Sequence, residues 1–433
     1  MRQPPHRRVA RRGVALAGLA AGCLAMALSG LAMAQFAPDD DARGVNVRNR
    51  PRPETDPVGV RAGSFIIHPT LRLDSSFDDN ILASGTRRES DFILRTTGTL
   101  DMRSDWGRHG LRGIAVVDDR RYLENPDENY LDWRAQGTGR YDISRSSHAD
   151  LTLGAARVHQ ERDDPDDFGN VSPIGIDERF IRAGYFVRGN RLGLRLDATF
   201  NTLRHDDADV VNNGVVTTRS QAFRNRDLYE LTAVAAYEVA PLRRVLVVAR
   251  ANKRDYVDES GAPGTITRDS KGGQLLAGVD ADYNGLFSYR LLVGYLYQEY
   301  EATNLPNASA PTGEAQLLWN VTTLTTIGFR AERRVQETIR SNASSYLRTI
   351  GTLSVDHEFD RNILLNASAT YRLDEFEGIS REDKIGIFAV GASYLLNRNV
   401  RLGAIYTFTT GDRGGGQADY ERNVFLLRLQ GAL

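Results

Sequence analysis

The chain has 433 residues, of which 41% are apolar and 26% charged, and its formal net charge is −1. Charges this evenly mixed give no footprint for nucleic acid. After residue 34 no apolar run reaches the roughly 18 residues that a membrane-spanning helix needs, which excludes a helical membrane protein. A chain this long with so few apolar residues would ordinarily form two or three soluble domains, yet no linker and no change of composition divides it.

Residues 1–34 are predicted to be a cleavable signal peptide. Five arginines form a cationic head, residues 13–31 an apolar middle, and Ala32-Met33-Ala34 a cleavage site. Export through the general secretory pathway is favoured over export through the twin-arginine pathway. Cys23 loosely resembles a lipoprotein acylation site, but cleavage there would leave an apolar run at the new N-terminus. The processed chain would have a formal charge of −6 and no cysteine, which excludes disulfides, thiolate metal sites and cysteine nucleophiles.

Residues 35–62 are predicted to be an extended periplasmic segment. It contains Asp39-Asp40-Asp41 and then Arg50-Pro51-Arg52-Pro53, a proline density that disfavours regular structure. The segment is too short to form the plug domain of an energised transporter.

Residues 63–433 are predicted to be one all-β domain, an antiparallel up-and-down transmembrane β-barrel. Apolar and polar residues alternate in stretches joined in turn by a short link and a longer polar loop, which is typical of outer-membrane barrels. Soluble β-propellers would instead repeat four strands with similar links throughout. The eighteen expected strands are 63–77, 91–105, 109–122, 129–142, 148–161, 177–189, 191–204, 223–239, 243–257, 270–284, 286–300, 311–321, 323–336, 345–358, 362–376, 384–396, 399–411 and 420–433.

The alternation also predicts which face meets lipid. In 191–204, Leu192, Leu194 and Leu196 fall on one side and Arg195 and Asp197 on the other, because successive side chains of a strand point to opposite faces. Aromatic residues such as Trp133 and Tyr141 fall near both ends of the apolar faces, as membrane girdles do. The last strand runs to Leu433, and we expect the barrel-assembly machinery to recognise it.

Alternation places a set of charged side chains on the inner face. The predicted pore-lining residues are Arg95, Arg103, Arg134, Arg140, Arg195, Arg330, Arg372, Arg401, Arg428, Asp101, Asp132, Asp142, Asp197, Glu332 and Asp374. They could bind a passing polymer, or simply neutralise one another across neighbouring strands. For any single residue we favour neutralisation, and for the set as a whole a polar conduit.

The loops show no convincing site. The acidic runs at 163–167 and 206–209 lack the ordered spacing of a calcium loop and are expected to be solvated surface loops. His159 and His205 lie near outer loops beside acids, but no nucleophile elbow or zinc-protease motif accompanies them. We therefore predict no enzyme activity and no catalytic, cofactor or metal-binding residues.

Several segments resemble the β-barrel porin 2 family of bacterial outer-membrane proteins. They are Arg50 to Glu54 with Asp56 to Phe65, Phe77 to Ile81, Ser104-Asp105-Trp106 with Arg108-His109, Leu318 to Thr322, and Tyr394 to Asn399. The likeness covers nearly the whole processed chain. It implies a Gram-negative outer-membrane location and an association with machinery for exopolysaccharide or capsule.

The expected function is a passive polar conduit, most simply for export of exopolysaccharide or capsular polysaccharide. The alternatives are a general diffusion porin for small solutes and a plugged barrel that serves structure or adhesion. The expected partners are outer-membrane lipid, lipopolysaccharide and periplasmic export components, the last docking on residues 50–53 and on the tight turns.

Overall fold

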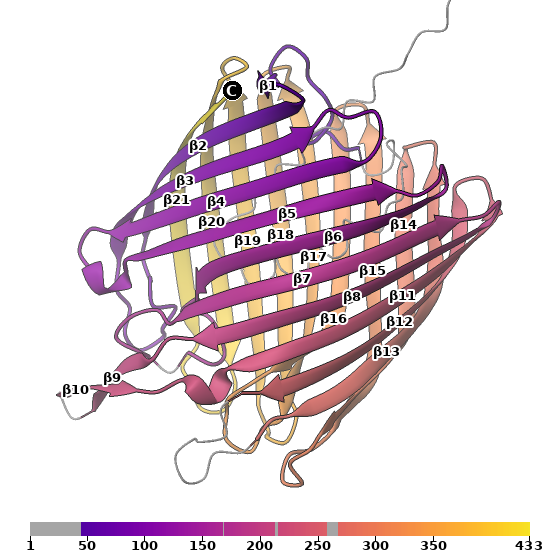
Figure 1. Cartoon of the computed structure of the whole chain (residues 1–433). Coiled ribbons are helices and arrows are strands. Elements are labelled where there is room, and N and C mark those ends of the chain that lie inside the picture. The colour runs from indigo at the N-terminus through magenta and orange to yellow at the C-terminus, as the bar shows by residue number, and fades with distance from the viewer. Residues whose placement is uncertain (1–44, 168, 213–214, 258–266) are drawn as a thin grey trace, which may run out of the picture.

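A computed structural model describes residues 45–433 except 168, 213–214 and 258–266 (Figure 1). The described residues are almost entirely β-strand, with two short 3-10 turns, η1 (Pro126–Glu128) and η2 (Ala222–Arg224). None of their helical segments is long and apolar enough to cross a membrane. The signal peptide predicted for residues 1–34 lies outside the described residues.

The described strands are long, and most hold 13 to 16 residues. Their bounds are β1 (Val60–Ala62), β2 (Phe65–Asp78), β3 (Asp91–Ser104), β4 (Gly110–Tyr122), β5 (Tyr130–Asp142), β6 (Ser147–His159), β7 (Gly175–Arg188), β8 (Leu192–His205), β9 (Ala208–Asn212), β10 (Val215–Arg219), β11 (Arg226–Ala240), β12 (Arg243–Tyr256), β13 (Ser270–Tyr283), β14 (Phe287–Tyr300), β15 (Ala308–Thr322), β16 (Thr325–Glu337), β17 (Ser345–Asp360), β18 (Ile363–Phe376), β19 (Glu382–Leu395), β20 (Val400–Arg413) and β21 (Tyr420–Ala432).

The eighteen strands other than β1, β9 and β10 close into one barrel. Each pairs antiparallel with its neighbour in the chain, and β21 returns to pair with β2 from Thr70↔Ala432 to Asp78↔Val424. β1 pairs with the start of β2, where β21 no longer reaches. Closure removes every sheet edge from the wall. The predicted all-β, eighteen-stranded barrel is therefore confirmed.

The strand ends agree with the sequence prediction to within three residues. The starts of β11 and β15 differ most, by three residues each; η2 occupies Ala222–Arg224 and delays β11 to Arg226, whereas β15 begins early, at Ala308. The hairpin of β9 and β10 was not predicted. Its strands have five residues each and pair only with one another, so they stand apart from the wall as a projection of the loop after β8 (Figure 1).

The outer face of the wall is apolar. Val293 is 72% exposed and Leu427 68%, an arrangement that only an apolar solvent tolerates over a whole surface. Tyr141 and Tyr237 are exposed on the same face, near the strand ends that meet the short turns. Those short turns share one end of the barrel with the C-terminus, and the long loops occupy the other (Figure 1). We call these ends periplasmic and outer.

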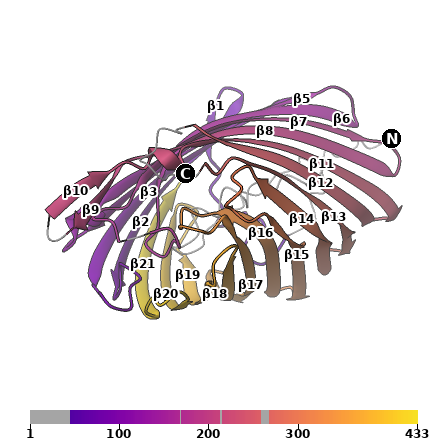
Figure 2. The same cartoon turned by 90° about the horizontal axis from the view of Figure 1, so that it is seen from below.

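The barrel bends sharply around β13 and β14, where its upper and lower walls meet (Figure 2). Leu246, Leu276 and Leu292 pack together on the inner side there, each at most 5% exposed. Gly278 and Gly294 permit the bend. A Cβ on either glycine would lie 1.8 Å from a backbone oxygen of the adjacent strand, so only glycine fits.

Candidate functional site

All fifteen side chains predicted to line the pore lie at inward-facing positions. In each strand these positions alternate with exposed apolar residues, as Asp132 does with Leu131 and Trp133. The inward-facing set is Arg95, Asp101 and Arg103 on β3; Asp132, Arg134, Arg140 and Asp142 on β5; Arg195 and Asp197 on β8; Arg330 and Glu332 on β16; Arg372 and Asp374 on β18; Arg401 on β20; and Arg428 on β21. Their role in passage stays a prediction.

Most of these charges are paired with one another. Asp101 accepts hydrogen bonds from Arg103 at 2.8 Å and from Arg112 at 3.0 Å. Arg195 donates to Asp197 at 2.7 Å and to Asp150 at 3.2 Å. Such pairs, within one strand and between strands, keep a polar wall neutral and stiff. Mutual neutralisation is thus the state of most of the wall.

Arg134 and Arg330 are exceptions. Within the part of the chain that the structure describes, neither has a carboxylate partner within ion-pair distance. Arg330 is exposed to the lumen in the middle of β16, while Arg134 lies near buried Glu178, which is 2% exposed and accepts a hydrogen bond from Asn201 at 2.7 Å. Arg330 is therefore the predicted pore-lining arginine whose charge is exposed to the lumen without an ion-pair partner among the described residues.

The loop of residues 160–174, which joins β6 to β7, crosses the outer end of the lumen. Arg372 Nη1 donates to Asp163 Oδ2 at 3.2 Å, and Arg372 Nη2 donates to the Asp163 carbonyl oxygen at 3.2 Å. Arg372 belongs to β18, eight strands from β6 in one direction around the wall and nine from β7 in the other. The loop therefore reaches the opposite wall. We call residues 160–167 the crossing segment.

Asp163 is held there by several positive charges. Burial raises the pKa of its carboxyl, but Arg372, Arg422, Arg348 and Arg413 together outweigh this and hold the pKa below its usual range. The carboxylate is therefore ionised at neutral pH.

A second anchor follows three residues later. Thr338 Oγ1 donates to Asp166 Oδ1 at 2.6 Å and the Ile339 amide to Asp166 Oδ2 at 3.1 Å, while Arg340 donates to the Pro165 carbonyl. These partners come from the loop between β16 and β17. Burial and the nearby charge of Asp164 raise the pKa of Asp166 to about 6.

The start of the crossing segment, directly after β6, is also held in place. Arg162 Nε donates to Glu128 Oε2 at 2.8 Å, and Arg224 Nη1 donates to Gln160 Oε1 at 3.1 Å. Glu128 lies in the loop after β4 and Arg224 in the loop before β11. Four loops at the outer end are therefore joined into one network through the crossing segment, and the contacts between them are polar rather than covalent.

The expectation that residues 163–167 form a solvated surface loop is wrong. Asp166 is only 7% exposed, because the run enters the lumen and meets arginines there. The sequence shows the acids but not their partners, which come from distant strands. Among the described residues, no group of three histidine, cysteine, aspartate or glutamate side chains is arranged to bind a metal.

The N-terminal segment occupies the periplasmic end. Asn320 donates to the Val45 carbonyl at 3.0 Å, and the Val47 amide donates to Thr326 Oγ1 at 3.0 Å. Arg52 and Arg50 both donate to Glu358 on β17, Arg52 at 2.7 Å. Farther along the segment, Asp56 lies 3.3 Å from Arg401 of β20. Residues 45–56, which we call the strap, thus follow the inner rim from β15 to β20.

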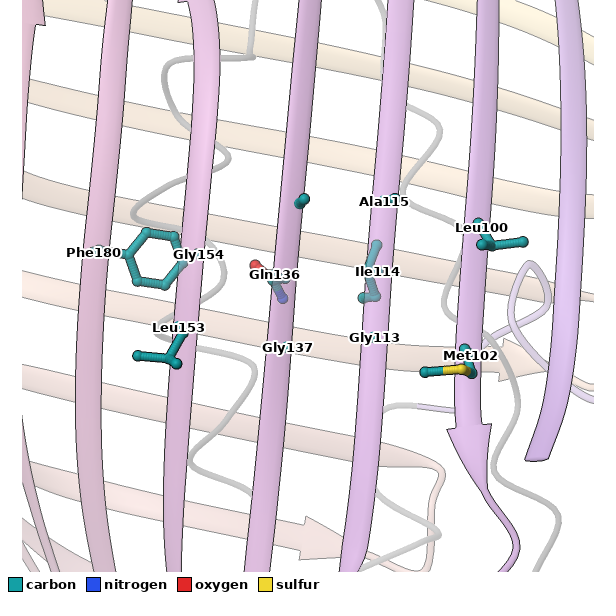
Figure 3. A pocket seen from close by; sticks show the side chains of 11 residues that line it. Leu100, Met102, Gly113, Ile114, Ala115, Gln136, Gly137, Leu153, Gly154 and Phe180 are labelled. Atoms are coloured by element: carbon teal, nitrogen blue, oxygen red, sulfur yellow. The ribbon is translucent and has the colours of Figure 1, made fainter. Parts of the chain in front are cut away.

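A shallow groove lies elsewhere, on the wall formed by β3 to β7 (Figure 3). Small residues at outward positions, including Gly113 and Gly137, make the groove between Leu100 and Leu153. On the inner side, Phe180 covers Gly154, where a Cβ would come within 2.4 Å of its ring. Aromatic covering of a strand glycine is a packing device, and the groove contains no group with an evident chemical task.

The chain is similar to several solved structures at low sequence identity. OpdL of Pseudomonas aeruginosa aligns over 86% of this chain and 100% of its own, with 14% identity and a TM-score of 0.44. OccAB3 of Acinetobacter baumannii aligns over 86% and 100%, with 12% identity and a TM-score of 0.45. The siderophore receptor PirA from Pseudomonas aeruginosa aligns over 89% and 81%, with 8% identity and a TM-score of 0.43.

These similarities are too distant to carry information about substrate. No curated protein matches the sequence. The family model described as Putative beta-barrel porin 2 matches residues 52–432, which is nearly the whole barrel with part of the strap. The chain therefore belongs to this family, and it is a porin-like β-barrel of the Gram-negative outer membrane.

Proposed function

We propose that the barrel is a passive conduit that exports exopolysaccharide or capsular polysaccharide through the outer membrane. The observation that supports the proposal is the crossing segment, which spans a polar lumen and is held to the opposite wall by ion pairs and hydrogen bonds. Contacts of this kind can be exchanged for contacts with a passing hydrophilic chain, since hydroxyl and carboxylate groups use the same donors.

A general diffusion porin is the rival proposal. A porin that serves small nutrients should stand open without a partner, whereas here four loops meet across the outer end. A closed resting state suits a conduit that opens only while polymer is being delivered. The family resemblance to barrels found with polysaccharide machinery points the same way.

The driving force would come from the periplasmic side. In the described residues nothing resembles the plug of an energised transporter, and the strap lies along the rim rather than across the lumen. We propose that a periplasmic export component docks on the strap and the adjacent tight turns, where Arg50, Arg52 and Arg398 present positive charge.

Two measurements test the proposal together. A strain lacking the protein should lose surface polysaccharide and regain it on complementation. The purified barrel should conduct rarely in planar bilayers and open readily when the crossing segment is shortened. Unchanged surface polysaccharide with a steadily open purified channel would favour the diffusion porin, and unchanged polysaccharide with a barrel that stays closed after shortening would favour the plugged structural barrel.

A further inference from the structure

Four arginines surround the carboxylate of Asp163 on the wall from β17 to β21. They are Arg348, Arg372, Arg413 and Arg422, and all four act electrostatically on Asp163. Two are neutralised by wall carboxylates. Arg348 donates to Asp374 at 2.7 and 2.8 Å, and Arg422 Nε donates to Asp78 Oδ2 at 2.9 Å.

The other two arginines depend on the crossing segment. Arg372 lies between Asp163, at 3.2 Å, and Asp374, at 3.4 Å, so it shares a carboxylate that Arg348 already uses. Arg413 has no carboxylate partner within ion-pair distance among the described residues, and its Nη2 is buried without a hydrogen bond. Without Asp163, this stretch of wall would carry an excess of two positive charges.

An unused donor lies beside them. Tyr420 is only 3% exposed, yet its hydroxyl makes no hydrogen bond in the described structure. Its ring lies under the Arg413 guanidinium, with 4.8 Å from Cζ to the ring centroid. A buried hydroxyl without a partner costs stability, so the Tyr420 hydroxyl is free to bond a ligand that reaches the two under-neutralised arginines.

We propose that Arg372, Arg413 and Tyr420 form a binding site for sugar carboxylates, and that Asp163 is its built-in occupant. We call these three residues the carboxylate site. Guanidinium groups hold carboxylates through paired, planar hydrogen bonds, and the contact of Asp163 with Arg372 shows that this arginine of the site accepts a carboxylate. A uronate in a passing chain would replace Asp163, release the crossing segment and satisfy Arg413 and Tyr420.

This inference deepens the proposed function, because it names an anionic, uronate-containing polymer as the cargo. The site can still exist if the barrel exports nothing. Its test is therefore a binding measurement, whereas the test of export is the loss of surface polysaccharide in a deletion strain.

The experiment is calorimetric titration of the detergent-solubilised, processed barrel with trigalacturonate as the probe. Maltotriose serves as the neutral sugar, and inorganic phosphate distinguishes carboxylate recognition from general anion binding. We expect trigalacturonate to bind at least about tenfold more tightly than maltotriose, since charge-assisted hydrogen bonds are about twice as strong as neutral ones. We expect it to bind more tightly than phosphate as well, because only the sugar acid offers Tyr420 a hydroxyl group in addition to the carboxylate.

Three variants locate the site. Asp163→Asn removes the competing charge and should tighten trigalacturonate binding several-fold. Arg413→Gln should weaken it about tenfold, and Tyr420→Phe about threefold, with the crossing segment undisturbed. Arg61→Gln is the matched control, because it removes an exposed arginine of β1 at the periplasmic end of the barrel, outside the predicted pore-lining set, and should change binding less than about twofold. Folding of each variant is checked by its heat-modifiable migration on gels.

Equal affinity for trigalacturonate and maltotriose would overturn the proposal, as would equal affinity for phosphate. So would an Asp163→Asn variant that binds no more tightly than the parent, or an Arg61→Gln effect as large as that of Arg413→Gln.

Discussion

Arg428 on the last strand and Asp74 on the first form a double hydrogen-bonded ion pair across the seam that closes the barrel. Arg428 Nε donates to Asp74 Oδ1 at 2.7 Å and Nη2 to Oδ2 at 2.9 Å. The Asp74 carboxylate is 1% exposed. Because both strands must meet before the pair exists, it contributes to closure and not to any single hairpin.

Arg428→Met should destabilise the barrel by about 2 kcal/mol, measured by urea unfolding in lipid vesicles. The loss leaves a buried carboxylate with only Arg72, 3.5 Å away, as a partner, and uncompensated buried charges are costly. Adding Asp74→Asn to this variant should restore at least half of the loss. A double variant less stable than Arg428→Met would contradict this account of the seam.

Gly278→Ala should lower the free energy of unfolding by about 3 kcal/mol, because the added methyl group meets the backbone oxygen of Leu291 and the sharp bend cannot relax. Gly98→Ala is the matched control. A Cβ at Gly98 meets nothing within 4 Å, so its stability should change by less than about 1 kcal/mol. Similar losses for the two variants would show that the bend does not require glycine.

Docking of the crossing segment should depend on pH through Asp166. Its pKa is raised from 3.8 to about 6 by burial and by Asp164, so the stability that it contributes is complete below pH 3.8 and lost as the pH rises through 6. The Asp163 pKa is lowered, so its contribution is present above pH 3.8 and is lost only in stronger acid.

Channel conductance at constant salt should therefore rise between pH 4 and about pH 6.5 and then level off. Asp166→Asn keeps a neutral side chain at every pH and should remove the rise. Conductance of the parent barrel that stays flat or falls across this range would contradict the assignment.

Glu358→Gln should release the strap. Arg50 and Arg52 both donate to this carboxylate, and their ion pairs cannot form with an amide. A protease that cuts after glutamate should then cleave at Glu54 about tenfold faster than in the parent, while Asp360→Asn, at the exposed end of the same strand, should leave the rate unchanged. Equal cleavage rates in all three proteins would mean that other contacts hold the strap.

The strands could be predicted from the sequence because a barrel in lipid imposes a rule on each residue. Val293 and Tyr295 must face the hydrocarbon while Leu292 and Gly294 face inward. The alternation of residue types within this one strand is enough to predict these directions. The tight turns are equally local. For this reason the strand ends were found to within three residues.

The positions of the crossing segment and the strap could not be predicted, because they depend on contacts between residues that are far apart in the sequence. Asp163 meets an arginine 209 residues away, and Asn320 meets a backbone oxygen 275 residues away. Nothing near Asp163 in the sequence distinguishes an acid inside the lumen from one in a solvated loop. The alternation along each strand predicts which charged residues face inward. Which of them lack an ion-pair partner among the described residues, as Arg330 does, depends on the register of several strands.

The central claim is that the crossing segment closes the lumen by docking on the opposite wall. Residues 35–433 contain no cysteine, so Asp166→Cys with Thr338→Cys allows these neighbours to be joined by a short thiol-reactive cross-linker and released by reductant. Single-channel conductance of this double variant should fall to the closed level on cross-linking and recover on reduction. A cross-linked barrel that conducts as well as the reduced one would contradict the account.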